Sequence, residues 1–225
     1  GGAMKRLVLL ILLGGAGCYN SNSSHGGNDA ATDDGAGPGS LRIEIVNVSS
    51  DRNAFVDACP HCNEAWLLRS TVGAGEELTL PGLLACRCSS CSSSGCLGMV
   101  DGPYSWIEIP PGAVLTFTWD GRRHDFTPGG CASTGSGCFA PSSAASGTYE
   151  VRVAYSLSSE SSATRGCPFG GVPWELEPYQ GVATIARCER TCAGAGCPAL
   201  ALEAVAAASF PWPGTETVRV ELGGG

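Results

Sequence analysis

The sequence predicts an all-β protein, a disulfide-rich antiparallel β-sandwich with long loops. Three observations lead to this fold class. Short apolar runs, some of them alternating with polar residues, recur along the chain as they do in β-strands. Glycine and proline separate these runs, and the 225 residues include 33 glycines and 14 prolines. Twelve of the 13 cysteines lie between Cys59 and Cys197, which favours loops held by disulfides in an exported domain.

The first predicted strand covers Leu41 to Val48. Its apolar residues Leu41, Ile43 and Ile45 alternate with polar ones, as in a strand with one buried face. Eight further strands are expected over Ala54 to Ala58, Ala65 to Leu68, Glu77 to Leu80, Ser105 to Ile109, Val114 to Trp119, Thr148 to Leu157, Val182 to Cys188 and Thr217 to Leu222.

Two stretches fit this pattern less well. Asn63 to Thr71 is compatible with a short helix as well as with a strand. Ala199 to Ser209 is rich in alanine, which favours a helix by propensity, but its apolar residues follow neither period. The second stretch is therefore left open between helix and strand.

One part of the chain resembles a known kind of domain. Pro111-Gly112 precedes the run from Val114 to Gly121, and a further run follows from Gly147 to Val153. This order of turns and strands is similar to that of bacterial immunoglobulin-like domains, among them the Bacillus intracellular proteinase inhibitor domain. The resemblance implies an immunoglobulin-like sandwich, and it transfers no inhibitory residue because fold does not determine function.

The N-terminal residues predict an export signal over 1–17. Residues 1–3 precede Met4 and are interpreted as a cloning remnant. Lys5 and Arg6 supply positive charge, Leu7 to Leu13 is apolar, and small residues follow up to Gly17. Seven apolar residues are too few to span a membrane, which needs about 20. We therefore expect this segment to direct export.

Cys18 directly follows Gly15-Ala16-Gly17, and this arrangement resembles the lipobox of bacterial lipoproteins. It departs from the commonest form, which has leucine where Gly15 stands. The resemblance implies lipidation of Cys18 and a lipid-anchored protein of the bacterial cell envelope, at the outer membrane or cell surface. An ordinary signal peptide followed by a chance cysteine is the alternative. Residues 18–40 would form a flexible tether, and residues 41–225 one folded domain.

Composition excludes several functions. Without Lys5 and Arg6, eleven arginines stand against 21 acidic residues, so the mature chain has a formal charge of −10. Such a charge disfavours nucleic acid as a partner. The mature chain has no lysine, so lysine-dependent catalysis is excluded. It also lacks the G-x-S-x-G and H-E-x-x-H motifs. We expect a protein that binds rather than catalyses, and we expect no cofactor.

The even number of remaining cysteines predicts six disulfides. The candidates are Cys59, Cys62, Cys86, Cys88, Cys91, Cys96, Cys131, Cys138, Cys167, Cys188, Cys192 and Cys197. Cys131 and Cys138 bracket a short loop and could pair with each other. The sequence does not define the complete pairing, because twelve cysteines allow very many connectivities.

Two cysteine motifs offer alternative functions. Cys59-Pro60-His61-Cys62 is similar to the active-site motif of DsbA-type thiol oxidases, which implies a redox pair assisted by His61 at the start of a helix over Asn63 to Arg69. A group of four thiolates could instead hold zinc or an iron–sulfur cluster, namely Cys86, Cys88, Cys91 and Cys96. Structural disulfides are the simpler interpretation of both motifs in an exported chain.

A few other side chains could form a site. His124 could bind copper or zinc together with His61, although an exposed histidine in a turn is the simpler interpretation. Trp106, Trp174 and Trp212 lie near predicted turns, where an exposed ring could contact a protein or a carbohydrate ligand. The alternative is that the tryptophan rings fill the sandwich core, as is expected of Trp119 in its strongly apolar strand.

Overall fold

The computed structural model describes residues 39–58, 67–71, 78, 88, 104–131, 137–167, 170–189 and 202–224. These residues form twelve strands and one short helix. In chain order the elements are β1 (Leu41–Asn47), β2 (Asn53–Asp57), β3 (Leu67–Ser70), β4 (Tyr104–Ile109), β5 (Val114–Trp119), β6 (Arg122–Thr127), β7 (Cys138–Ser143), β8 (Gly147–Ser158), α1 (Ser162–Arg165), β9 (Glu175–Tyr179), β10 (Ala183–Cys188), β11 (Ala204–Trp212) and β12 (Thr217–Leu222).

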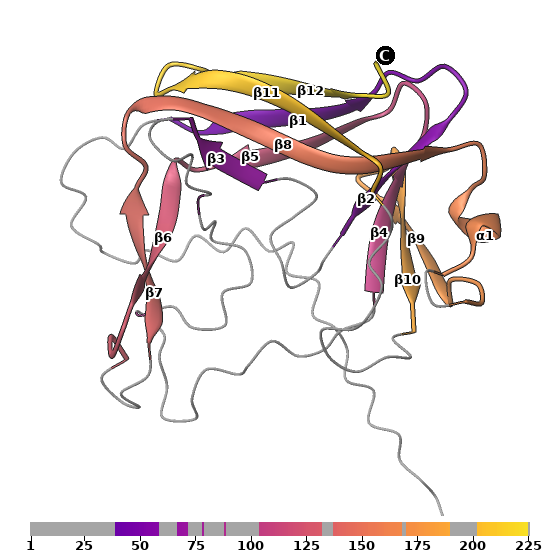
Figure 1. Ribbon diagram of the computed structural model, residues 1–225, viewed down its shortest axis with the longest axis horizontal. Helices are drawn as coiled ribbons and strands as arrows, with labels where there is room; N and C mark the ends of the chain where they lie inside the picture. The colour runs from indigo at the N-terminus through magenta and orange to yellow at the C-terminus, as the bar shows by residue number, and fades with distance from the viewer. Residues whose placement is uncertain are drawn as a thin grey trace, which may run out of the picture. The chain divides into compact units, whose positions relative to one another are not determined.

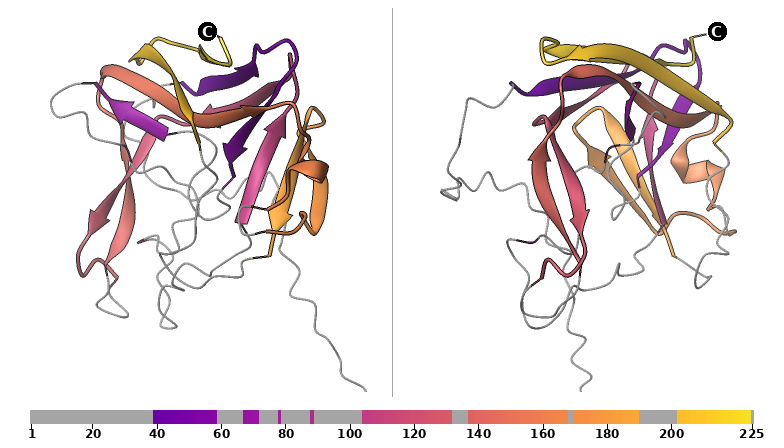
Figure 2. Two further views of the ribbon diagram at one scale, coloured as in Figure 1. Left: turned by 45° about the vertical axis from the view of Figure 1, so that its right-hand side comes forward. Right: turned by 60° about the vertical axis from the view of Figure 1, so that its left-hand side comes forward.

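The strands form three sheets (Figure 1; Figure 2). The first has the order β12-β1-β5, and the second has the order β11-β8-β2-β4-β10-β9 with β3 also paired to β8. The third is the two-stranded ribbon β6-β7. All pairs are antiparallel except β1 with β12, which run parallel. The all-β prediction is confirmed, whereas the immunoglobulin-like assignment stays a prediction.

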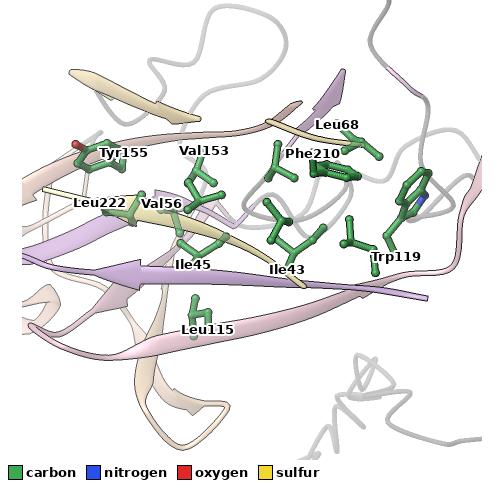
Figure 3. Packing of buried hydrophobic residues seen from close by; sticks show 14 of the residues in the cluster. Ile43, Ile45, Val56, Leu68, Leu115, Trp119, Val153, Tyr155, Phe210 and Leu222 are labelled. Carbon is green, nitrogen blue, oxygen red and sulfur yellow. The ribbon is translucent and has the colours of Figure 1, made fainter. Parts of the chain in front are cut away.

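The first and second sheets pack face to face through one apolar core (Figure 3). Alternation creates this core, because every second side chain of β1 and β12 points inward. Ile43 and Ile45 from β1 lie against residues of the second sheet that include Val56, Val153 and Phe210. Each fully buried side chain of this size contributes about 1.5–3 kcal/mol.

Asn47 joins the ends of both packed sheets. Its side chain is fully buried, and its Nδ2 donates to the carbonyl oxygens of Arg52 and Ile109, each at 2.8 Å. Its Oδ1 accepts from the backbone N–H of Ser49 at 3.0 Å. One amide side chain thus satisfies three backbone groups at the junction, as buried polar groups require.

Most predicted strands are confirmed, with shifts of one or two residues at their ends. The helix considered over Asn63 to Thr71 is wrong for Leu67–Ser70, which form β3 and bury Leu68 against β8. The alanine-rich stretch becomes a strand from Ala204 onward, because pairing with β8 along all nine residues of β11 outweighs alanine's helix propensity. The strand predicted over residues 77–80 lies outside the described residues apart from Leu78.

Candidate functional site

Exposed large apolar side chains are concentrated at one edge of the second sheet. Of the seven such residues in the described part of the chain, four lie on β9 or next to it, namely Val172, Trp174, Leu176 and Val182. The most exposed of the others are Phe126 on β6 at 60% and Val205 on β11 at 55%. Val172 is 69% exposed, Trp174 58% and Leu176 44%, and Pro178 is also exposed. Every second side chain from Val172 to Pro178 therefore faces solvent. We name Val172, Trp174, Leu176 and Pro178 the β9 strip.

The β9 strip lies on the outer face of the second sheet. Leu176 is opposite Ala186 in the strand register, and opposite residues point to the same face. Ala186 belongs to a small cluster with Phe55 and Trp106 that is separate from the main core. The strip thus lies on the same face of the sheet as this buried outer cluster, and exposed apolar side chains gathered on one face are typical of interaction sites.

Acidic side chains occupy the opposite face of β9. The guanidinium of Arg187 binds the carboxylates of both Glu175 and Glu177, with the N–O distance to Glu177 being 3.1 Å. The hydrogen bond from Arg187 holds the pKa of Glu175 below its ordinary value of 4.5. Two carboxylates share one guanidinium, so one negative charge remains uncompensated within this group.

Gln180 holds the end of the β9–β10 hairpin. Gln180 and Gly181 have φ values of 50° and 72°, so both central residues of the turn from Tyr179 to Val182 have a left-handed backbone. The backbone N–H of Val182 donates to the carbonyl oxygen of Tyr179 across this turn. The Gln180 side chain accepts from the backbone N–H of Thr116 and donates to its carbonyl oxygen, both at 2.9 Å. It therefore pairs with β5, the edge strand of the first sheet, and fixes the hairpin to it.

The segment that includes α1 crosses the outer face before the chain enters β9 (Figure 1). Glu108 on β4 is only 8% exposed, and its carboxylate accepts from the Asn53 side chain and from the backbone N–H of Ser162, both at 2.7 Å. The Trp106 ring donates to the hydroxyl of Ser162 at 3.0 Å. These buried bonds attach α1 to the sheet.

Two further contacts complete this attachment. The guanidinium of Arg165 lies 4.4 Å from the centre of the Phe55 ring, a cation–π distance. A disulfide joins Cys167 to Cys188 on β10. Further along the chain, the backbone N–H of Trp174 donates to the carbonyl oxygen of Arg187, which also lies on β10. The exposed Trp174 thus follows a covalently anchored segment, which favours a preorganised surface.

The tryptophans considered in the sequence analysis differ in their exposure to solvent. Trp106, Trp119 and Trp212 are at most 3% exposed. The core interpretation is therefore confirmed for all three, and an exposed ring at Trp106 or Trp212 is wrong. Trp174 is exposed, as a binding role requires. Trp66 lies outside the described residues.

No strand was predicted over β9. The alternation from Val172 to Pro178 has the period of a strand, although it includes Pro173 and Pro178. Proline is compatible with an edge strand, because one side of such a strand needs no hydrogen-bond donors.

The described disulfides correct two predictions about cysteines. Cys88 pairs with Cys138, 50 residues away, so the pairing considered between Cys131 and Cys138 is wrong. Cys88 is also no thiolate ligand in this structure, which contradicts the four-cysteine metal site. Cys131 is buried. The other proposed cysteine positions lie outside the described residues: Cys18, Cys59, Cys62, Cys86, Cys91, Cys96, Cys192 and Cys197.

The redox motif Cys59-Pro60-His61-Cys62 lies outside the described residues, whereas the strand before it and part of the segment after it are described. The strand expected before it is confirmed as β2, and burial raises the pKa of the Asp57 carboxyl at the end of that strand. The helix expected after it is wrong over Leu67–Arg69, because β3 lies there. A DsbA-type motif requires a helix directly after it, and residues 67–69 at the end of the expected helix do not support one.

His124 is buried in β6 rather than exposed in a turn, and His61 lies outside the described residues. In the part of the chain that the structure describes, no group of three or more potential ligand side chains is placed to hold a metal ion.

No helix within the described residues has the length and apolar character needed to cross a membrane. No family model, curated protein or solved structure matches the chain.

Proposed function

We propose that this chain is a binding module whose contact surface is the β9 strip. The observation that supports this proposal is the 58% exposure of Trp174 within a row of exposed apolar side chains. The disulfide at Cys167 and the buried bonds around Glu108 fix the segment before it. A rigid aromatic anchor of this kind is typical of the residues that contribute most to protein interfaces.

The β9 strip offers enough apolar area for useful affinity. At about 25 cal/mol per Å², covering the exposed parts of Trp174 and Leu176 would contribute a few kcal/mol. The other edge of the same sheet offers much less. On β11 the exposed side chains include Ala207 and Ser209, and Val205 is the only large apolar one. We therefore place the contact surface at β9.

We further propose that the protein is exported and attached to the bacterial cell envelope through lipid on Cys18. The support comes from the signal-like residues before Cys18 and from the small residues directly preceding it. Replacement of Cys18 by serine should move the protein from the detergent-rich to the aqueous phase in a detergent partition of whole cells. Unchanged partition of that variant would contradict lipidation at Cys18.

Photo-crosslinking tests the binding surface without knowledge of the partner. A photoreactive amino acid replaces either Trp174 or Val205 in the full chain expressed in bacteria. The two positions are matched, because they are 58% and 55% exposed and lie at opposite edges of one sheet, Trp174 directly before β9 and Val205 on β11. We expect discrete adducts from position 174 and none from position 205. Equal labelling at both positions, or no adduct at 174, would contradict the proposed function.

A further inference from the structure

We infer that the occupant of the β9 strip is an extended segment of another polypeptide, in which apolar and basic residues alternate. This segment adds to β9 as a further antiparallel or parallel strand of the second sheet. The inference rests on the proposed function and specifies the chemistry of the partner. The open edge of β9, its apolar face and its acidic face support the inference.

One edge of β9 is open. Within the described residues, β9 is the last strand of its sheet and pairs only with β10. By contrast, the edge of β5 is covered at Thr116 by the Gln180 side chain. Strand edges that remain open can pair with an extended peptide through main-chain hydrogen bonds. Pro173 and Pro178 have no N–H, so the pairing would centre on the residues between them.

The two faces of β9 differ in their chemistry. A strand added beside it would alternate its side chains between the face of Trp174 and Leu176 and the face of Glu175 and Glu177. Apolar side chains suit the first face. On the second face, Arg187 is shared by two carboxylates, so a basic side chain would neutralise the remaining charge and an acidic one would be repelled. The net charge of −8 favours approach of a basic segment.

The same charges disfavour a second copy of this chain. If two β9 strands paired antiparallel about Leu176, Glu175 of one copy would lie opposite Glu177 of the other. Like charges directly opposite each other destabilise a strand pair. A saccharide could stack on Trp174, but it would use neither the open edge nor the acidic face.

Three synthetic ten-residue peptides with blocked ends provide the test. The first alternates arginine and valine, the second alternates glutamate and valine, and the third contains five valines followed by five arginines. Binding to the full chain is measured by titration calorimetry at fixed salt concentration. We expect the first peptide to bind at least about tenfold more tightly than the other two. Equal binding of the alternating and block peptides would overturn the strand geometry, and equal binding of the acidic peptide would overturn the charge requirement.

Variants of the protein locate the binding. Glu177→Arg should weaken binding of the arginine peptide by about tenfold and strengthen that of the glutamate peptide. Glu221→Arg on β12 makes the same change in net charge at an exposed glutamate and should leave the ratio of the two affinities unchanged. Trp174→Ala should weaken binding, whereas Val205→Ala should not. Insensitivity to both Trp174→Ala and Glu177→Arg would overturn the inference.

Two further measurements distinguish the other occupants. Sedimentation of the protein alone would overturn the inference if it showed a dimer that Trp174→Ala abolishes, because a second copy would then occupy β9. Binding of cellohexaose that depends on Trp174, without binding of the arginine peptide, would also overturn it. In either case, adducts from position 174 would leave the proposed function intact. Absence of those adducts would instead contradict the proposed function itself.

Discussion

Glu108 provides a sharp test of how α1 is attached to the second sheet. Its two carboxylate oxygens accept hydrogen bonds from Asn53 and from the backbone of Ser162, each at 2.7 Å, and the side chain is 8% exposed. Glu108→Gln keeps the shape of the side chain but replaces one acceptor oxygen by an NH2 donor. With the Asn53 amide oriented as described, the new donor faces another donor in either orientation, so one N–H loses its partner. Turning the Asn53 amide over would relieve this only by giving up its bond to the carbonyl oxygen of Glu160.

The expected cost follows from these contacts. One unsatisfied buried donor costs about 1–3 kcal/mol, so Glu108→Gln should lower the free energy of unfolding by that amount. Glu108→Ala removes both acceptors and leaves a gap, so its loss should be larger, about 3–5 kcal/mol.

Urea denaturation with the disulfides intact measures these losses. Glu221→Gln is the matched control, because Glu221 is 55% exposed and its ion pair with Arg219 lies at the surface. The control should change stability by less than about 0.5 kcal/mol. If Glu108→Gln were as stable as this control, the carboxylate would not hold α1 as described, and the account of how the sheet supports the chain before Trp174 would be wrong.

Three further predictions concern other parts of the fold. Asn47→Asp should lower the melting temperature more than Asn47→Ala, since the charged oxygen would face the carbonyl oxygens of two residues; equal melting temperatures would contradict the described orientation. Gln180→Ala should lower the free energy of unfolding by about 1–2 kcal/mol, and Gln180→Gly should be about 1 kcal/mol more stable than Gln180→Ala because φ is 50°. The opposite order in urea denaturation would refute this. The pKa of Glu175 is lowered in the folded state, so its contribution to stability is present above pH 4.5 and is lost as the pH falls through the lower folded-state pKa. Arg187→Gln should reduce this loss in acid denaturation, and an unchanged acid profile would argue against the ion pair.

The sequence predicted the fold class because alternation in β1, β5, β8 and β12 reflects one buried face. Local propensity failed where pairing with a distant strand decided the conformation. Leu68 is the example in β3, and the alanines of β11 are another.

The candidate site was only partly predictable. Trp174 was identified as one of several aromatic residues, but its exposure depends on the position of β9 at the edge of the sheet. The pairing of Cys88 with Cys138 also depends on the tertiary fold, because no spacing rule relates cysteines 50 residues apart. The order of strands within a sheet is the information that the sequence pattern lacks.

Hydrogen exchange on the full chain tests the central claim, that β9 is a binding edge, most directly. Exchange of backbone amides is followed by mass spectrometry with and without the alternating arginine–valine peptide. The account predicts slower exchange in the segment from Val172 to Tyr179 and no change in β11, the opposite edge strand. Protection of β11 with none at β9, when the peptide is bound, would contradict it.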